Sequence, residues 1–181
     1  SRHEKVPGEH LLSADYEALD EAARERTALD LATFFAELHA LDSAVMAEAG
    51  AAPIDPFPPA DEVLEDAWPF LSPSLRAYAE TTMQAFEALP ADPLGVTYGF
   101  FDGHGWNLAF DHAAQRLNGV YDFADSGFGE LQREFLYPNF VARDLTVRIA
   151  RAYQALTGRE IDMTRVDVLT GVLRLVEVAM Y

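Results

Sequence analysis

Apolar side chains recur at intervals of three and four residues along several stretches of the chain, which is the spacing of one face of an α-helix. The clearest stretch covers 25–41, another covers 74–89, and a shorter one follows Ser13, a residue type that caps helices. One glycine and four prolines in 50–59 interrupt the pattern and predict a loop. The positions that this spacing predicts to be buried are Leu29, Ala32, Phe34, Phe35, Leu38 and Leu41 in the first helix and Leu75, Tyr78, Ala79, Met83 and Phe86 in the second.

Glycines and short apolar pieces replace the helical spacing over 94–129. Within this region, 107–111 and 117–123 predict two strands joined by a polar connection, which is a β-hairpin. Helical spacing returns in 141–157 and 164–181, and the glycine after the first of these is a signal for a helix end. The predicted fold class is therefore mainly α with a small β-hairpin. The predicted buried positions of the last two helices are Leu145, Ile149, Ala152 and Leu156, and Val168, Val172, Leu175 and Val178.

The amino-acid composition excludes several classes of function. The chain has 181 residues, half of them hydrophobic, which excludes wholesale disorder. It has no cysteine, so disulfides, thiolate zinc sites and cysteine nucleophiles are excluded. A formal net charge of -17 argues against a nucleic-acid partner and suits a cationic one. No apolar run reaches membrane-spanning length, and no basic-then-apolar leader opens the sequence, so we expect a cytoplasmic protein without a membrane partner.

Three oxygen-bearing side chains are predicted to meet at the hairpin. Asp102 follows an aromatic run, Asn107 comes five positions later across two glycines, and Asp122 ends the second strand. Because a hairpin returns its second strand beside its first, Asp122 is expected near Asn107. Carboxylate and amide oxygens suit Mg²⁺, which completes its shell with water and phosphate oxygens. Together with a carboxylate that orients or deprotonates a hydroxyl, these are the parts of a phosphoryl-transfer site.

The segment 101–107 (FDGHGWN), followed by 119–127 (GVYDFADSG), resembles the active-site region of the aminoglycoside phosphotransferase family, which includes choline kinase-like enzymes and shares its fold with protein kinases. The resemblance implies that Asp102 is the catalytic residue that orients or deprotonates the acceptor hydroxyl. It implies that Asn107 and Asp122 bind Mg²⁺ and, through it, the phosphates of ATP or GTP. Two further residues fall at positions that can support this site, His104 and Asp125.

The resemblance extends over the whole chain, which implies a C-terminal lobe of the protein-kinase-like fold. The segment 31–41 is similar to the helix after the interlobe hinge of the family. Shorter similar segments are 7–9, 129–134 and 152–158. The implied layout is one C-terminal lobe over 1–181, with a helical acceptor-binding portion in 13–90 and 130–181 and a catalytic core in 94–129.

The sequence departs from the family pattern at several points. Phe100 stands where the family has a histidine that braces the catalytic loop, Ala124 replaces a glycine, and Leu131 replaces a proline. No strand-rich segment or glycine-rich phosphate loop precedes the helices, and the only lysine, Lys5, lies in a polar lead-in. We therefore expect the N-terminal β lobe, which clamps the nucleotide, to be absent from this chain and present in the full-length protein.

These observations leave several functions open. The first is an ATP- or GTP-dependent, Mg²⁺-assisted phosphotransferase to a hydroxyl of a small molecule, aminoglycoside-like or otherwise amine-bearing. The alternatives are a catalytically inactive kinase-like binding module and a metal-dependent phosphohydrolase. A purely helical interaction domain is weaker, because it leaves the polar cluster without a purpose. Three aromatic residues can either line the acceptor pocket or belong to the core: Trp68, Trp106 and Tyr137.

Overall fold

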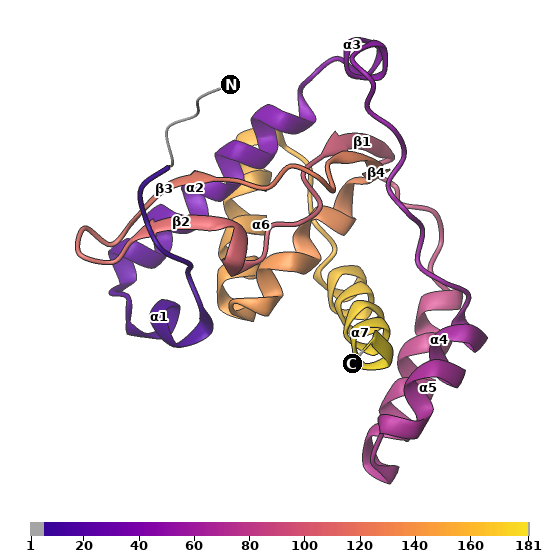
Figure 1. The fold of residues 1–181 in the computed structure, drawn as a ribbon. Coiled ribbons are helices and arrows are strands. Elements are labelled where there is room, and N and C mark those ends of the chain that lie inside the picture. The colour runs from indigo at the N-terminus through magenta and orange to yellow at the C-terminus, as the bar shows by residue number, and fades with distance from the viewer. Residues whose placement is uncertain (1–5, 181) are drawn as a thin grey trace.

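Helices make up most of the computed structural model, which describes residues 6–180 (Figure 1). Lys5 and the last residue of the predicted helix 164–181 lie outside the described residues. No helix within 6–180 has the length and apolarity needed to cross a lipid bilayer. The helices are α1 Ser13–Ala18, α2 Glu21–His39, α3 Ser43–Glu48, α4 Ala60–Ala67, α5 Pro73–Glu87, α6 Arg143–Thr157 and α7 Met163–Met180. The strands are β1 Val96–Gly99, β2 Leu108–Asp111, β3 Arg116–Val120 and β4 Gly127–Glu130, and 3-10 segments cover Trp68–Phe70, Gly105–Asn107 and Leu131–Phe140.

Helices α2 and α6 pack against each other and form the centre of the main core. The carboxylate of Asp20 accepts a hydrogen bond from Ala23 N at 2.7 Å, which caps α2 and begins it four residues before the predicted start. The 3-10 segment Leu131–Phe140 also packs on α6 and contributes Leu131 and Phe135 to the same core. The buried face of α2 consists of Ala23, Thr27, Ala28, Leu31, Ala32, Phe35 and His39.

The predicted burial was wrong for several large apolar side chains. Leu29 and Leu41 are 49% and 44% exposed, because the face of α2 that meets α6 runs through Ala28, Leu31 and Phe35, and because α2 ends at His39. An amphipathic helix buries one arc of its circumference, and an apolar residue outside that arc stays in contact with water. The same applies to Leu75 and Tyr78 in α5, Leu156 in α6 and Val178 in α7, which are all exposed.

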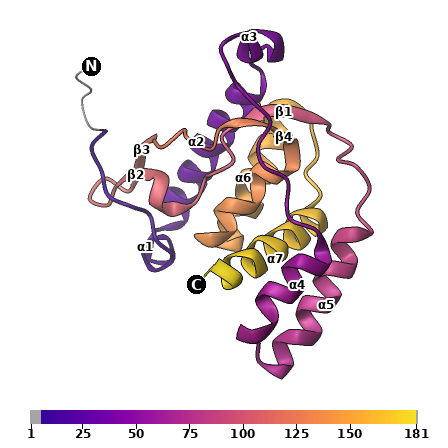
Figure 2. The ribbon, with the colours of Figure 1, turned by 45° about the vertical axis from the view of Figure 1, so that its right-hand side comes forward.

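Helices α4 and α5 form an arm that packs on α7 and has a core of its own (Figures 1 and 2). Helix α4 falls in a stretch where the sequence predicted no helix. Helix α7 joins the arm to the main body, since its Val166 belongs to the main core and its Val172 to the core of the arm. The buried members of the second core are Ala60, Val63, Ala67, Leu71, Ala79, Met83, Val172 and Leu175.

Two separate antiparallel sheets of two strands flank the polar loops. The predicted hairpin is present as β2–β3, in which Leu108 pairs with Val120 and Asp111 with Arg116. The sequence did not predict the second pair, β1–β4, whose strands are short, rich in glycine and about 30 residues apart. Strand β1 leads into the loop 100–107 and β4 follows the loop 121–126, so the two sheets together position both loops.

Gly158 ends α6 in the left-handed conformation, with φ 73° and its N–H donating to Gln154 O at 2.8 Å. We expect Gly158→Ala to lower the free energy of unfolding by about 1 kcal/mol, because an L-residue is strained at this φ. An added Cβ meets no atom within 4 Å, so the loss comes from the backbone alone. Urea denaturation measures it, and an unchanged or raised free energy of unfolding contradicts the assignment.

Candidate functional site

The loop 100–107 is anchored by the carboxylate of Glu134, which is fully buried in the segment Leu131–Phe140. The backbone N–H groups of Phe100 and Phe101 donate to Glu134 Oε2 and Oε1, each at 2.8 Å. Phe101 has a φ of 54°, a conformation that is costly for a bulky residue unless its surroundings hold it. A buried carboxylate is stable only when donors surround it, so the two bonds satisfy Glu134 and hold the strained backbone immediately before Asp102.

Two more side chains extend this buried network into the main core. His39 Nε2 of α2 lies 3.4 Å from Glu134 Oε2, and His39 Nδ1 lies 2.9 Å from the hydroxyl of Tyr153 in α6. The sequence placed Glu134 and His39 in segments that resemble the family, but the bond from His39 to Tyr153 was missed. Helical spacing predicts only that these positions are buried. It does not show that two buried side chains on different helices form a hydrogen bond.

Asp102 is held by hydrogen bonds at both oxygens of its carboxylate. His104 Nε2 lies 3.0 Å from Oδ1, and Asn107 Nδ2 donates to Oδ2 at 2.6 Å. A carboxylate only accepts hydrogen bonds, so His104 carries its proton on Nε2, and this bond raises the pKa of His104. The side chain of Asp102 remains 17% exposed, so its oxygens are fixed in direction and open to a small molecule.

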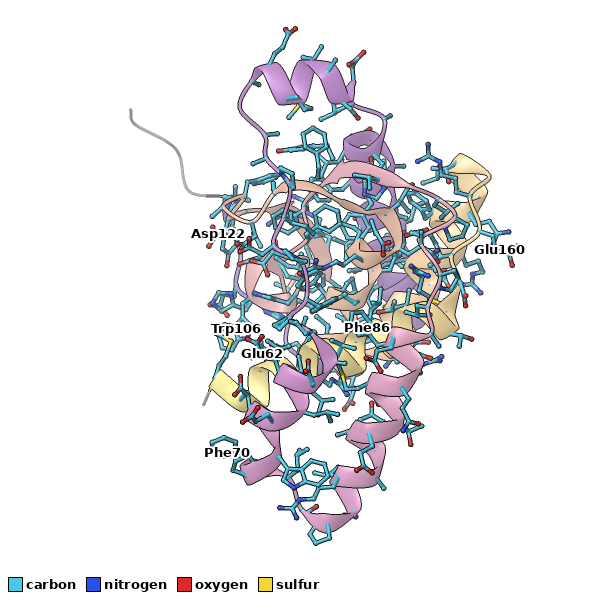
Figure 3. The ribbon with its side chains drawn as sticks, turned by 90° about the vertical axis from the view of Figure 1, so that its right-hand side faces the viewer. Glu62, Phe70, Phe86, Trp106, Asp122 and Glu160 are labelled. Carbon is cyan, nitrogen blue, oxygen red and sulfur yellow. The ribbon has the colours of Figure 1, made fainter. Side chains whose placement is uncertain are left out.

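The hairpin brings the backbone of Asn107 beside the residue before Asp122, since Tyr121 N donates to Asn107 O at 3.1 Å. Asp122 follows directly, with a φ of 63° that turns the chain out of the strand and leaves the side chain exposed. Figure 3 places Asp122 and Trp106 on the same side of the molecule, opposite Glu160. The predicted neighbourhood of Asn107 and Asp122 is therefore present at the level of the backbone.

Asp125 adds a further carboxylate to this side of the molecule. Burial, and then the negative charges of Asp102 and Asp122, raise the pKa of Asp125. Asp125 is thus close enough to Asp102 and Asp122 for their negative charges to act on it.

The oxygen-bearing side chains of this site suit Mg²⁺ better than a metal whose ligands all come from the protein. Within residues 6–180, no three His, Asp or Glu side chains are arranged to hold a metal ion. Mg²⁺ needs only one or two protein carboxylates when phosphate and water supply the other oxygens. Both hydrogen bonds of the Asn107 side chain are made by its nitrogen, to Asp102 O and Oδ2, which leaves its oxygen for a cation. Asn107 and Asp122 therefore stay the predicted Mg²⁺ ligands.

Phe100 fills the position where the family has a histidine, and aromatic packing surrounds it. Its side chain is fully buried, and its ring centroid lies 5.7 Å from that of Phe34 and 5.0 Å from that of Phe123. Phe123 directly follows Asp122, so this packing connects the two loops of the site. The ring of His104 contacts Asp102, whereas the loop backbone is held by Glu134, which His39 contacts in turn.

Two cavities adjoin Asp102, and both are lined by Asp102 and Tyr137. The first, of about 370 Å³, includes Asp55, Asp125 and Arg133. The second, of about 480 Å³, includes Trp106, His104 and Glu177. Burial raises the pKa of Tyr137 to about 12, so its hydroxyl stays protonated between the two cavities.

Of the three aromatic residues singled out in the sequence, Trp106 and Tyr137 therefore line a cavity. Trp68 lies apart from both cavities, under the guanidinium of Arg76.

A third cavity, of about 830 Å³, lies between the segment 6–15 and the hairpin. Its walls include Val6, Gly8 and His10 from the segment before α1, and Tyr121, the neighbour of Asp122.

Comparison with known proteins shows the family and the fold of the chain. The family model described as "Phosphotransferase enzyme family" matches residues 1–169. Comparison with curated protein sequences gives no match. Among solved structures, a GDP complex of a mutant of aminoglycoside 2'-phosphotransferase-IIIa is 22% identical, with a TM-score of 0.78 over 97% of this chain and 59% of that one.

Two further solved structures are similar. The GDP and kanamycin complex of an aminoglycoside phosphotransferase is 20% identical, with a TM-score of 0.75 over 97% of this chain and 60% of that one. The apoenzyme of a macrolide 2'-phosphotransferase from Brachybacterium faecium is 17% identical, with a TM-score of 0.64 over 98% and 62%. The predicted fold class, resembling a C-terminal lobe, is confirmed, and the chain spans about 60% of the length of these structures.

Proposed function

The chain belongs to the phosphotransferase enzyme family, and from that premise we propose that it carries the catalytic and acceptor-binding part of a kinase for a hydroxyl group of a small, amine-bearing molecule. The observation that carries the proposal is the placement of Asp102. Its carboxylate is fixed at both oxygens and lies where two cavities meet. Because the chain spans about 60% of the structures it matches, the activity is proposed for the protein at its natural full length.

Asp102 would accept a hydrogen bond from the acceptor hydroxyl and take its proton as the phosphate bond forms. The hydrogen bonds from His104 and Asn107 leave the carboxylate little freedom to rotate, so the hydroxyl is aimed before it reacts. Glu134 acts through the backbone at Phe100 and Phe101 and keeps this geometry without touching the acceptor.

Asn107 and Asp122 would hold Mg²⁺, which neutralises charge on the phosphates of a nucleoside triphosphate when it is bound. Similar solved structures contain GDP in several cases and ATP in another, and we propose a purine nucleoside triphosphate as the donor.

Acidic side chains near Asp102 favour an acceptor that carries an amine. Asp55 and Asp125 line the cavity of about 370 Å³ with Asp102, against a single cation, Arg133. The N–H groups of Arg133 are partly committed, since one donates to Asp55 O at 2.7 Å. A cationic group on the acceptor would offset this excess of negative charge.

A second candidate function is a kinase-like module that binds nucleotide without transferring phosphate. The observation in its favour is Phe100 at the position of the family histidine. Incubation of the full-length protein with Mg²⁺ and ATP or GTP, and a panel of amino alcohols, separates the two by mass spectrometry. Phosphorylated acceptor supports the kinase, and nucleotide binding without any product supports the binding module.

Asp122→Asn in the full-length protein is expected to weaken Mg²⁺-dependent nucleotide binding by about 100-fold, because the metal loses its only charged ligand from the protein. Calorimetry with a non-hydrolysable nucleotide, with and without Mg²⁺, measures the effect. Asp111→Asn, the same change at the far end of the hairpin, should bind as the parent does. Equal affinities for the Asp122 variant and the parent contradict the role of Asp122.

A further inference from the structure

Tyr121 connects the two loops that carry the predicted Mg²⁺ ligands, 100–107 and 121–126. Its backbone N–H donates to Asn107 O at 3.1 Å. Its side-chain hydroxyl donates to Trp106 O, one residue earlier in the loop, at 2.5 Å. Tyr121 is thus bonded to the loop 100–107 twice, once through its backbone and once through its side chain.

The segment before α1 supplies a second partner for the same hydroxyl. His10 Nδ1 lies 3.0 Å from the hydroxyl oxygen of Tyr121. The hydroxyl has one proton, and it donates that proton to Trp106 O, because a carbonyl oxygen can only accept. His10 is therefore the donor in its bond to Tyr121 and carries a proton on Nδ1. The imidazole of His10 also packs against the indole of Trp106, with the ring centroids 4.7 Å apart.

Backbone contacts hold the segment before α1 against the hairpin and the loop 100–107 (Figure 1). Glu9 and Phe110 exchange two backbone hydrogen bonds, at 2.9 and 2.8 Å. Leu11 N donates to Gly105 O at 3.1 Å. A Cβ on Gly105 would clash with the carbonyl oxygen of Leu11, so the close approach of the two segments requires glycine there. His10 thus lies on a stretch of backbone that is fixed on both sides.

We propose that Tyr121 is a positioning residue for the two predicted Mg²⁺ ligands, Asn107 and Asp122. His10 acts on them through the hydroxyl of Tyr121. This inference rests on the proposed function, since it concerns the Mg²⁺ that these side chains would hold. Asp122 is exposed and has a φ of 63°, an uncommon conformation outside glycine, so its direction depends on how the residue before it is held.

The hydroxyl of Tyr121, and not its ring, makes this connection. Tyr121→Phe keeps the ring and removes the bonds to Trp106 O and His10. The residue is 36% exposed, so water can satisfy the groups that lose their partner, and the variant should stay folded. Water does not replace the fixed separation between Trp106 and the residue before Asp122. The change therefore falls on the geometry of the metal ligands.

Tyr121→Phe in the full-length protein is expected to weaken Mg²⁺ binding about tenfold, the lower end of what groups that orient metal ligands contribute. Affinity for nucleotide without Mg²⁺ should stay within twofold of the parent. Calorimetric titration of Mg²⁺ into protein saturated with the imido analogue of ATP or GTP measures the effect. Tyr98→Phe is the matched control, since the Tyr98 ring packs on Phe128 of β4 and its hydroxyl forms no hydrogen bond within residues 6–180.

Hydrogen exchange of the metal-free protein gives a readout that needs neither nucleotide nor turnover. The backbone amide of residue 121 donates to Asn107 O, and it should exchange about three- to tenfold faster in Tyr121→Phe, because the side-chain bond that supports it is lost. Amides within α6 should exchange at the parental rate in the same variant. Faster exchange at residue 121 without weaker Mg²⁺ binding overturns the inference, since the bonds then hold the loop without positioning the ligands.

His10→Phe tests the second half of the proposal, because it keeps a ring against Trp106 and removes the donor to Tyr121. We expect Mg²⁺ binding about threefold weaker than in the parent. Both changes act on one hydroxyl, so the double variant should bind Mg²⁺ no more weakly than Tyr121→Phe alone. Losses that multiply in the double variant overturn the link from His10.

The outcomes for the two proposals are distinguishable. Mg²⁺ affinity within twofold of the parent in Tyr121→Phe, with phosphate transfer to an alcohol by the parent, overturns this inference and leaves the kinase proposal intact. Weaker Mg²⁺ binding in Tyr121→Phe, without phosphate transfer to any alcohol by the parent, supports the inference and contradicts the kinase proposal. A parent that binds nucleotide equally well with and without Mg²⁺ overturns the inference together with the assignment of Asn107 and Asp122.

Discussion

Asp102→Asn in the full-length protein is expected to lower kcat for phosphate transfer by about 10²- to 10⁴-fold, the usual contribution of a positioned general base. Asparagine occupies the same volume, but it cannot take a proton from the acceptor hydroxyl. It also offers a single acceptor oxygen, so it cannot accept from both His104 and Asn107 as the carboxylate does. The variant therefore loses both the group that takes the proton and the fixed orientation of the side chain, while nucleotide affinity should change little.

The measurement is initial-rate kinetics with a phosphorylated amino alcohol as product, alongside circular dichroism to establish that the variant is folded. Asp66→Asn is the matched control, since Asp66 is an exposed carboxylate of α4, remote from both cavities at Asp102. It should retain the parental rate. A kcat for the Asp102 variant within a few-fold of the parent would remove Asp102 from the proposed reaction.

Glu134→Gln is expected to lower the free energy of unfolding by about 2–4 kcal/mol, because buried donors lose a charged acceptor. Phe100 N–H and Phe101 N–H each donate to a different oxygen of Glu134, and glutamine replaces one of those oxygens with a donor. The side-chain amide nitrogen of glutamine then faces a backbone N–H group in the core, and neither can accept a hydrogen bond from the other. The left-handed backbone at Phe101 also loses its support, so kcat should fall together with stability.

Thermal and urea denaturation measure the first effect, and kinetics at a temperature where the variant is folded measure the second. Glu160→Gln is the control, because Glu160 is exposed and lies on the opposite side of the molecule from Asp122 (Figure 3). A Glu134 variant as stable as the parent would mean that the observed bonds do not hold the loop. A variant of lower stability with parental kcat would mean that Glu134 supports the fold only.

The sequence alone determined the elements that local spacing encodes. Helices α2, α5, α6 and α7 and the hairpin β2–β3 follow from periodicity within one segment, and so does the stop at Gly158. The motif 101–107 with 119–127 also indicated the family, and the hairpin was sufficient to expect Asn107 near Asp122. Each of these predictions depends on residues a few positions apart, where the chain geometry leaves few alternatives.

Only the tertiary structure decided what depends on contacts between distant segments. It showed which apolar residues are buried, as the exposed Leu29 and buried Ala28 illustrate, because the neighbouring helix selects the buried arc. It paired β1 with β4, placed Glu134 under Phe100 and Phe101, and set Glu177 in the same cavity as Asp102. Residues 75 positions apart have no fixed relation along the chain, and it is the packing of α7 against the rest of the fold that brings them together.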